Sequence, residues 1–590
     1  MKDSVRKLAM LFDKREKKKL FIIFLMMILA AIFETMSIGI IIPFVGILTN
    51  PDMIQEQPIL SYVYDLFNFD STTAFIVFAV GILILVFVLK NLYLLLFNYV
   101  QYRIILNQQV KLSSRLFKEY LTKPYTFHLQ RNTAELLRNV NGEVSNVFQG
   151  IIISGFQLFT ELLVTICIVS LLFITEPLAT VVASILLGGS VFLFFKLFRK
   201  KINHLGEEQQ LVNSEMIKWV NQGLGASKEV KVSGKEGFFI NAYTKQSTIK
   251  ANNSRYMKML EQAPRLFIET LLVATVLVTM LIIVLQGSGT AHLISSMALF
   301  AMAAFRLMPS ITRIMALVTT IRYNQPALKV VYEDLFENRD ESTNPITNKS
   351  IVINQGKRTF NDSIKLTNVS FRYPNQEGYA IKDVSLTIPI GQSVAFIGES
   401  GAGKTSLVDI ILGLLKPEKG ELLVDGKRIH DQINIWQQKI GYIPQSIFLS
   451  DDTIRSNVAF GTEHNLIDDE EVWRSLDQAH LKEFVKALPD QLDTTVGERG
   501  VRLSGGQRQR IGIARALYHN PEILFMDEAT SALDNETEKE IMKAIDGLKG
   551  EKTLIIIAHR LSTIENCNII FKINKGRLTA IENRAKQSAI

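Results

Sequence analysis

The chain has 590 residues, of which 48% are hydrophobic, and a formal net charge of +8. It contains only two cysteines, Cys167 and Cys567, which excludes a disulfide framework and a cysteine metal site. The mean hydropathy of +0.19 is high for a soluble enzyme, and the positive charge is compatible with nucleic acid, anionic lipid or basic cytoplasmic loops.

Six segments are long and apolar enough to cross a hydrocarbon core of ~30 Å as helices. They are residues 20–47, 73–100, 146–174, 178–198, 264–286 and 292–320. The first segment continues without a small-residue cleavage site, which predicts a retained span and not a signal peptide.

The loops between these segments differ in charge. Residues 1–19 and 101–143 are rich in Lys and Arg, whereas residues 48–72 contain neither. This asymmetry predicts that both termini are cytoplasmic, and it accounts for part of the net charge without nucleic acid.

The long cytoplasmic stretches, 101–145 and 199–263, have helical patterns, so we expect the spans to continue as helices below the membrane. Outside the membrane, Pro58–Phe67 is compatible with a small amphipathic helix or an ordinary loop.

The composition changes after the sixth span, where residues 337–350 are polar and turn-rich. From about residue 363, β-rich runs alternate with helical patterns, which is typical of a soluble α/β domain. We therefore expect a helical six-span transmembrane domain with long cytoplasmic extensions (1–336), a linker (337–362) and an α/β ATPase domain (363–590).

The stretch GESGAGKT, residues 398–405, follows a strand-like run and opens a helix, the context required of a phosphate-binding loop. Glycines let backbone N–H groups surround phosphate oxygens at the positive end of the helix. Lys404 adds a full charge, and Thr405 offers a hydroxyl to Mg²⁺. The alternative is a glycine turn that arose by chance, but this would not account for the strand before the loop and the helix after it.

A second element, ILFMDEAT (523–530), is a buried strand followed by two carboxylates. Asp527 suits Mg²⁺, and Glu528 is placed to polarise an attacking water. Alternatively, the two acids could belong to a solvated turn. The presence of a phosphate loop in the same domain argues against this alternative.

A third element, Ser504-Gly505-Gly506, lies at a helix start and forms a further anion-binding half-site. Two chains paired head to tail would bring this half-site against the phosphate loop of the partner.

Together, GESGAGKT, LSGGQ and ILFMDE resemble an ATP-binding cassette (ABC) domain over about residues 363–580. The resemblance implies catalytic roles for Glu528, His559 and Gln445, and Mg²⁺ binding by Thr405, Gln445 and Asp527. The ATP-binding residues that it implies are Tyr373, Gly398, Glu399, Ser400, Gly401, Ala402, Gly403, Lys404, Thr405, Ser406, Ser504, Gly505, Gly506, Gln507 and Asp534.

Six spans followed by one such domain resemble a half-transporter exporter. The resemblance implies a homodimer with two composite sites for ATP and Mg²⁺. It also implies that cytoplasmic turns near Tyr125–Leu129 and Glu236–Tyr243 dock on the ATPase domains.

Ionisable residues within the predicted spans are costly unless they face a cavity or find a partner. The cations are Lys90, Arg265, Arg306 and Arg313, and the acids are Glu34, Glu161 and Glu269. One interpretation is internal pairing, such as Arg265 with Glu269 or Lys90 with Glu34. The other is a cationic track that binds an anionic headgroup.

The segments FETMSIGIIIPF, APRLFIE and FRLMPSITRI resemble the bacterial flippase for lipid-linked oligosaccharides. This implies an anionic polyprenyl-pyrophosphate glycan as substrate, membrane lipids as neighbours and a location in the bacterial inner membrane. A multidrug, peptide or lipid A-type exporter remains the alternative, while the six spans exclude a soluble ABC ATPase of DNA repair or translation.

Overall fold

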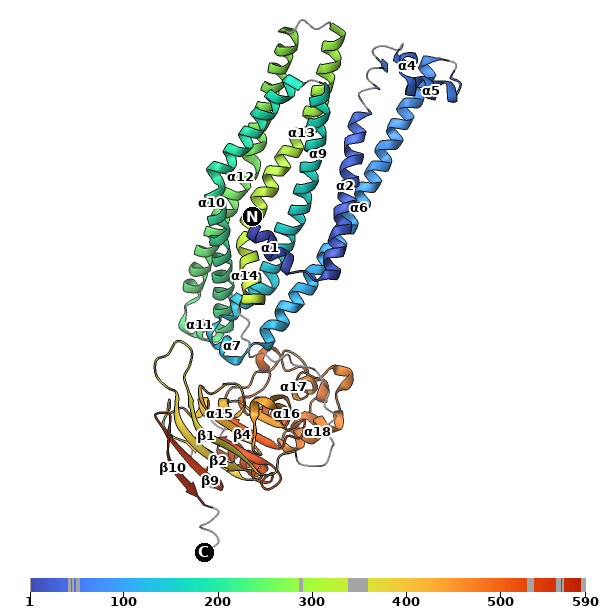
Figure 1. The fold of residues 1–590 in the computed structure, drawn as a ribbon. Helices are drawn as coiled ribbons and strands as arrows, with labels where there is room; N and C mark the ends of the chain where they lie inside the picture. The colour runs from blue at the N-terminus through green and yellow to red at the C-terminus, as the bar shows by residue number, and fades with distance from the viewer. Residues whose placement is uncertain are drawn as a thin grey trace. The chain divides into compact units, whose positions relative to one another are not determined.

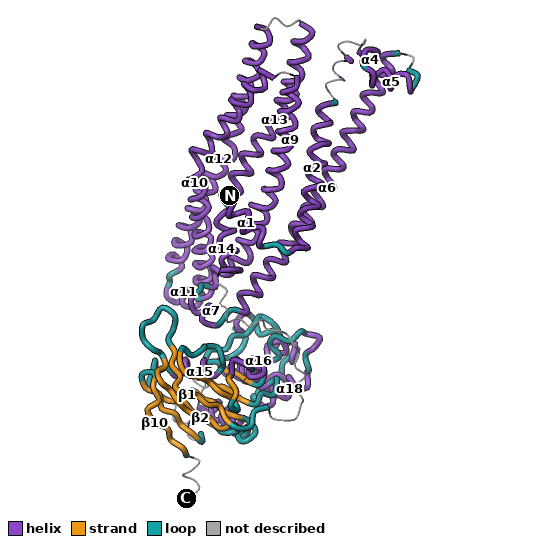
Figure 2. Tube along the Cα trace, in the orientation of Figure 1, coloured by secondary structure: helices purple, strands orange, loops and turns teal. Residues whose placement is uncertain are grey.

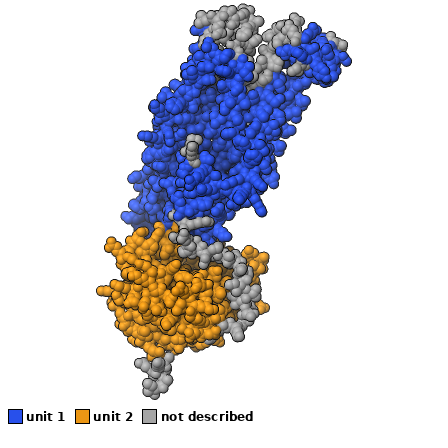
Figure 3. All heavy atoms as spheres, in the orientation of Figure 1, with its two compact units in different colours: residues 1–123, 131–343 blue, residues 124–130, 344–590 orange. Residues whose placement is uncertain are grey.

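The computed structural model describes residues 2–40, 44, 47–48, 53–69, 71–175, 177–285, 290–337, 359–527, 535–558, 564 and 567–584. The chain divides into two compact units, which Figure 3 shows in different colours. One comprises residues 1–123 and 131–343, and the other comprises residues 124–130 and 344–590. The predicted linker lies largely outside the described residues.

The first unit is built from long helices that coincide with the six predicted spans (Figure 1). These helices are α2 (Lys14–Gly39), α6 (Thr72–Thr122), α9 (Ser154–Thr175), α10 (Pro177–Gly225), α12 (Glu236–Leu285) and α13 (Thr290–Tyr323). Helix α6 has 51 residues, or about 75 Å at 1.5 Å per residue, more than twice a hydrocarbon core of ~30 Å. The predicted continuation of the spans as helices beyond the length of a membrane span is confirmed, and the side of the membrane on which they continue stays a prediction.

Several of these helices meet the length and hydropathy criteria for a membrane span. Within the part of the chain that the structure describes, the qualifying segments are Lys14–Met36, Thr72–Thr122, Thr133–Ile174 and Thr180–Gly225.

Shorter helical segments precede, connect or follow the long ones. They are α1 (Lys2–Met10), α4 (Met53–Glu56), α5 (Pro58–Leu66), α8 (Thr133–Arg138), α11 (Ser227–Ser233), α14 (Gln325–Tyr332) and three π-helical segments, η1 (Asn139–Glu143), η2 (Asn146–Ile153) and η3 (Glu333–Glu337). Helix α5 begins with Pro58, whose fixed φ suits the first helical turn. Of the two alternatives for Pro58–Phe67, the helix is therefore confirmed.

Apolar side chains from five of the long helices form a shared core. Its buried members are Ala31, Val164, Ile168, Leu172, Leu187, Ile268, Leu307, Ile311 and Met315. On α9 and α13 these residues recur every four positions, so each helix presents one apolar stripe to its neighbours.

The third predicted span, residues 146–174, begins with the π-helical segment η2 and continues as the α-helix α9. The turn between α13 and α14 packs closely against η2 and α10, and a glycine at each contact makes this possible. A Cβ on Gly150 would lie 2.3 Å from Nδ2 of Asn324, and a Cβ on Gly206 would lie 2.2 Å from the carbonyl oxygen of Tyr323. Single π-helical turns within helices often accompany functional sites.

The second unit contains two β-sheets, drawn in orange in Figure 2. One has the order β2-β1-β4-β5 and the other β10-β9-β3-β8-β7-β6. The strands are β1 (Ser363–Phe371), β2 (Ile381–Pro389), β3 (Ser393–Ile397), β4 (Lys419–Val424), β5 (Lys427–Arg428), β6 (Ile440–Ile443), β7 (Ile523–Asp527), β8 (Thr553–Ile557), β9 (Ile569–Asn574) and β10 (Arg577–Asn583). The expected α/β domain is confirmed.

Helices surround these sheets. They are α7 (Tyr125–Gln130), α15 (Lys404–Ile411), α16 (Ile433–Gln438), α17 (Ile454–Val458), α18 (Asp469–Gln478), α19 (Lys482–Lys486), α20 (Gly505–Leu517) and α21 (Asn535–Asp546), with 3₁₀ turns at Ile429–Asp431, His464–Leu466, Gln491–Asp493 and Glu498–Gly500. Strands β7 and β8 are buried along their whole length, as is typical of a parallel sheet covered on both faces.

Candidate functional site

The loop between β3 and α15 requires glycine at several positions. Gly398, Gly401 and Gly403 have φ values of 152°, 78° and 102°, a region that other residues rarely adopt. A Cβ on Gly398 would lie 2.1 Å from the carbonyl oxygen of Ile573. The loop can therefore fold this tightly against its surroundings only with glycine there.

Lys404 is the first residue of α15, and its side chain turns back across the loop. Its ammonium donates to the carbonyl oxygens of Gly398 at 2.9 Å and Glu399 at 3.0 Å, and the residue is buried. A buried ammonium beside the positive end of a helix favours an anion. The loop therefore fits the phosphates of ATP.

The parallel sheet brings further predicted residues to the same edge. Strands β3, β8, β7 and β6 run parallel, so their carboxyl ends meet at one edge. Asp527 ends β7 and is buried, and Gln445 follows β6. His559 follows β8 in the sequence, but it lies, with Glu528 and Asp534, outside the described residues.

Thr405, Gln445 and Asp527 offer a hydroxyl, an amide oxygen and a carboxylate, ligands that suit the hard cation Mg²⁺. Asp527 meets this role as a buried carboxylate at the carboxyl edge of the sheet. These residues fit a magnesium ion bound together with the phosphates.

A second carboxylate lies close to Asp527. Burial and the negative charge of Asp527 raise the pKa of Asp409 on α15 to about 6. Burial, Asp527 and Asp409 also raise the pKa of Tyr442 on β6. Neither Asp409 nor Tyr442 was assigned from the sequence, because neither belongs to the motifs.

Helix α7 belongs to the same compact unit as the ATPase sheets. Burial, Asp409 and Tyr373 raise the pKa of Tyr125, the first residue of α7. The turn Tyr125–Leu129 therefore lies next to α15. Glu236–Tyr243 begins α12 in the helical unit, and its docking on an ATPase domain stays a prediction.

Tyr373, the predicted adenine contact, lies beside the start of α15. Its hydroxyl is 2.9 Å from Oγ of Ser406, and its ring packs edge-on against Phe371 with the ring centroids 5.0 Å apart. These contacts hold the aromatic ring next to the phosphate loop.

The LSGGQ segment opens α20 with a capping box. Oγ of Ser504 accepts from the N–H of Gln507 at 3.2 Å, and Oε1 of Gln507 accepts from the N–H of Ser504 at 2.9 Å. Gly505 is exposed, with open space where a side chain would lie. The helix start is therefore ordered by its own residues and remains accessible to an anion.

Arg515, near the end of α20, is a structural residue that the sequence analysis missed. It donates to the carbonyl oxygens of Asn457 and Phe448, each at 2.8 Å, and burial lowers its pKa to about 10. It fastens α20 to the segment that follows Gln445. A single arginine in the apolar stretch IGIARAL is the signal that could have revealed it.

Internal pairing occurs for one of the predicted substrate cations, with a partner that the sequence did not indicate. Nε of Arg313 on α13 lies 2.9 Å from Oε1 of Glu161 on α9. Arg265 and Glu269 are both exposed and form no ion pair with each other or with any other described residue. The side chain of Arg306 lies outside the described residues.

Lys90 lies on α6, where its ammonium is 4.8 Å from the centroid of the Phe87 ring. Among the described residues, it too forms no ion pair. Neither Lys90 nor Arg265 therefore has an acidic partner among the residues that the structure describes.

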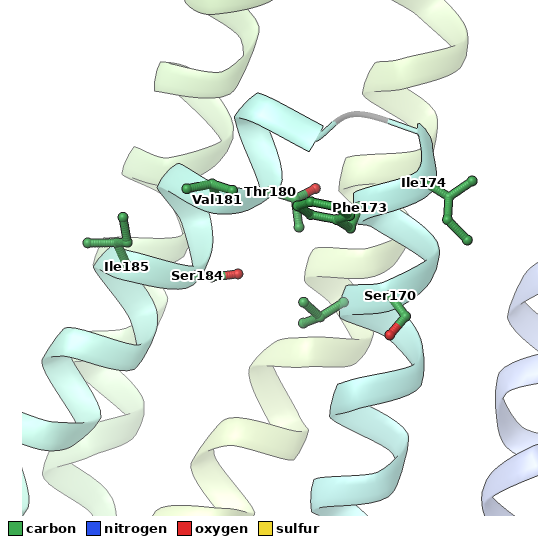
Figure 4. A pocket seen from close by; sticks show the side chains of 8 residues that line it. Ser170, Phe173, Ile174, Thr180, Val181, Ser184 and Ile185 are labelled. Carbon is green, nitrogen blue, oxygen red and sulfur yellow. The ribbon is translucent and has the colours of Figure 1, made fainter.

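An apolar pocket of about 560 Å³ lies between α9 and α10 (Figure 4). Its lining consists of Val169, Ser170, Phe173, Ile174, Thr180, Val181, Ser184 and Ile185. Lys90, Arg265 and Arg313 do not contribute to it, so this pocket is not where the described cations gather.

A phosphate loop, a buried acidic strand end and a set of helices long enough to span a bilayer define a membrane-bound P-loop ATPase. Residues 381–531 match the ABC transporter family, and residues 20–308 match the ABC transporter transmembrane region. The chain belongs to the ABC transporter family. It is an ATP-driven exporter of the half-transporter type, and two such chains form a transporter.

Similar proteins include two that are named ATP-dependent lipid A-core flippase. The protein of Cupriavidus pinatubonensis is 32% identical over 80% of this chain and 78% of its own. That of Saccharophagus degradans is 33% identical over 81% and 79%. The heterocyst differentiation ATP-binding protein HepA of Nostoc sp. is 29% identical over 93% and 88%.

A solved structure of a bacterial Atm1-family ABC exporter with ATP bound has the same fold. The two chains align with a TM-score of 0.79 at 23% identity, over 98% of this chain and 97% of the other. The expected fold class, a helical transmembrane domain joined to an α/β ATPase domain, is confirmed.

Proposed function

We propose that this exporter moves a phosphate-bearing glycolipid from the inner to the outer leaflet, and that a lipid A-type glycolipid is the first candidate. The observation that carries the proposal is the likeness to lipid A-core flippases, which extends over about four-fifths of both chains. The similarity includes most of the transmembrane region, where the substrate would bind.

The cations within the predicted spans support an anionic substrate. Lys90 and Arg265 form no ion pair with a described residue, and half of the Arg313 side chain is exposed beside Glu161. Unpaired charges at such depth are costly unless they meet a polar cavity or an anion. Arginine is well suited to phosphate because its guanidinium forms two parallel hydrogen bonds.

A lipid-linked oligosaccharide is the second candidate. It is favoured by the resemblance of FETMSIGIIIPF, APRLFIE and FRLMPSITRI to the flippase for such lipids. Both candidates carry phosphate groups next to sugars, so the same cations would serve either. An uncharged drug or a peptide has no phosphate group with which these cations could interact.

Each chain would contribute to ATP hydrolysis in two places. Lys404 and the loop around it bind the phosphates of one nucleotide, and the start of α20 faces the nucleotide of the partner. Glu528 would orient the attacking water, while Thr405, Gln445 and Asp527 would hold Mg²⁺, whose positive charge would offset that of the phosphates. A homodimer in the bacterial inner membrane, with both termini cytoplasmic, would carry two equivalent sites.

The substrate class can be tested by mass spectrometry of lipids that co-purify with full-length Glu528→Gln protein. We expect a phosphate-bearing glycolipid to be retained without nucleotide and released when ATP and Mg²⁺ are added. Its mass separates a lipid A-type molecule from a prenyl-pyrophosphate glycan. Lys404→Ala protein is the control, because it should retain the lipid after ATP is added. Recovery of bulk phospholipid alone would contradict the proposal.

A further inference from the structure

Two arginines from different helices lie at the cytoplasmic ends of their spans. Arg199 on α10 directly follows the predicted span 178–198, and Arg322 on α13 lies two residues beyond the span 292–320. Helices α10 and α13 pack against each other. On the predicted topology, both residues therefore lie at the level of the inner-leaflet headgroups.

The side chain of Arg322 lies over an aromatic ring of α10. The guanidinium carbon of Arg322 lies 5.5 Å from the centroid of the Phe195 ring. Phe195 precedes Arg199 by four residues, so both lie on the same face of α10. Arg322 thus reaches across to α10 and is held on the face that carries Arg199.

Burial and the positive charge of Arg199 lower the pKa of the Arg322 guanidinium. Because the ordinary value is 12.5, the Arg322 guanidinium remains a cation at neutral pH. The exposed Arg199 and the partly buried Arg322 therefore repel each other, and an anion between them would relieve the repulsion.

The protein supplies no such anion from the described residues. Neither Arg199 nor Arg322 forms an ion pair or a side-chain hydrogen bond with any of them. Glu261, an acid on the neighbouring helix α12, is engaged by the hydroxyl of Thr320. Lys200 and Lys201, which follow Arg199, add further positive charge.

Solvent exposure alone accounts for Arg199, because long basic side chains often extend to the membrane surface. It does not account for Arg322, which is only partly exposed and lies against Phe195. The combination of partial burial, a like-charged neighbour and no counter-charge indicates an external ligand.

We propose that Arg199 and Arg322 together bind the phosphate of a lipid headgroup in the inner leaflet. Two guanidinium groups can surround a phosphate with parallel charge-assisted hydrogen bonds. The lipid tail would remain in the bilayer beside α10 and α13. The ligand can be a bulk anionic phospholipid or a transported lipid, and the site does not depend on which glycolipid the exporter moves.

Native mass spectrometry of the full-length protein tests this site with three lipids of known composition. They are phosphatidylglycerol, undecaprenyl pyrophosphate and zwitterionic phosphatidylcholine. The test variant is Arg199→Gln with Arg322→Gln. The matched control is Lys228→Gln with Lys245→Gln, which removes two exposed charges from cytoplasmic helices. Melting temperature and basal ATPase activity report whether each variant is folded.

We expect the double arginine variant to lose about tenfold in affinity for at least one of the two anionic lipids, while the control variant binds as the wild type does. Selective loss of phosphatidylglycerol identifies a site for bulk lipid, and selective loss of undecaprenyl pyrophosphate identifies a site for transported lipid. If the double variant is unstable, the exposed Arg199→Gln change alone should still weaken binding.

Equal retention of both anionic lipids by wild type, control and arginine variants would overturn the proposal. The double arginine variant can lose lipid binding as expected while the wild type fails to move glycolipid in proteoliposomes. That result would contradict the proposed function and would leave this site in place.

Discussion

Arg313 on α13 and Glu161 on α9 form an ion pair within the predicted transmembrane region, with Nε 2.9 Å from Oε1. The other carboxylate oxygen of Glu161 is buried and has no hydrogen-bond partner among the described residues. The pair joins two helices that also share an apolar core. Arg313 therefore has a structural role whether or not it also contacts substrate.

Arg313→Ala should destabilise the protein by about 1 to 3 kcal/mol, because it leaves the largely buried Glu161 carboxylate without its donor and counter-charge. Glu161→Gln combined with Arg313→Gln should recover most of this loss. Thermal unfolding in detergent measures both effects. An Arg313→Ala protein as stable as the wild type would show that the pair contributes nothing.

The same double variant separates stability from transport. If Arg313 also binds the headgroup, the Glu161→Gln/Arg313→Gln protein should be stable yet slow in moving lipid. Arg265→Gln is the sharper single test, because Arg265 forms no ion pair with a described residue. From the sequence, pairing with Glu269 was one of two interpretations of Arg265, and the structure shows no such pair.

A buried hydrogen bond joins the cytoplasmic end of α6 to η3. The hydroxyl of Tyr120 donates to Oδ2 of Asp334 at 2.5 Å, and Nδ2 of Asn139 donates to the same oxygen at 3.0 Å. Tyr120→Phe should cost about 1 to 3 kcal/mol of stability, since it deprives a buried carboxylate of a donor. Tyr102→Phe, which alters an exposed tyrosine, should change the unfolding temperature little. Equal shifts in the two variants would refute this assignment.

Asp409 should make stability depend on pH. Burial and the negative charge of Asp527 raise its pKa from the ordinary 3.8 to about 6. Between these values the unfolded chain loses its proton first, so the free energy of unfolding should fall as the pH rises through this window. The destabilisation then persists above about pH 6.

Asp409→Asn should therefore stabilise the nucleotide-free protein at neutral pH, and the difference should vanish below about pH 4. Denaturant unfolding of the full-length protein at several pH values measures it. Asp490→Asn, at an exposed position, is the control. A stabilisation by Asp409→Asn that does not change with pH would rule out a titrating carboxylate.

Cysteine labelling should confirm the orientation in the membrane. Asp65 on α5 and Lys118 on α6 are both exposed in the structure, so the side of the membrane decides their reactivity. In a background without Cys167 and Cys567, an impermeant reagent on intact cells should label Asp65→Cys and not Lys118→Cys. The opposite pattern would invert the topology.

Much of the architecture could be predicted from local patterns. Apolar runs identified the positions of the long helices, and the spacing of Gly398, Lys404 and Asp527 predicted a phosphate site at the edge of a parallel sheet. These features depend on neighbours in sequence or on the rule that parallel strands end at one edge.

Contacts between distant segments were not predictable in this way. The partner of Arg313 lies on another helix, and the close approach of Asn324 to Gly150 depends on how helices pack. The π-helical turns leave no periodic signal, because each shifts the helix phase by one residue. Asp409 and Arg515 owe their roles to burial, which the motifs do not reveal.

The most direct test of the account is lipid movement in proteoliposomes that contain the purified homodimer and a fluorescent lipid A-type or prenyl-pyrophosphate glycolipid. We predict that ATP and Mg²⁺ drive the glycolipid to the leaflet opposite the ATPase domains in wild type, and that Glu528→Gln protein binds ATP but moves none. If wild type hydrolyses ATP without moving either glycolipid, or if Glu528→Gln moves them at the normal rate, the proposed function is wrong.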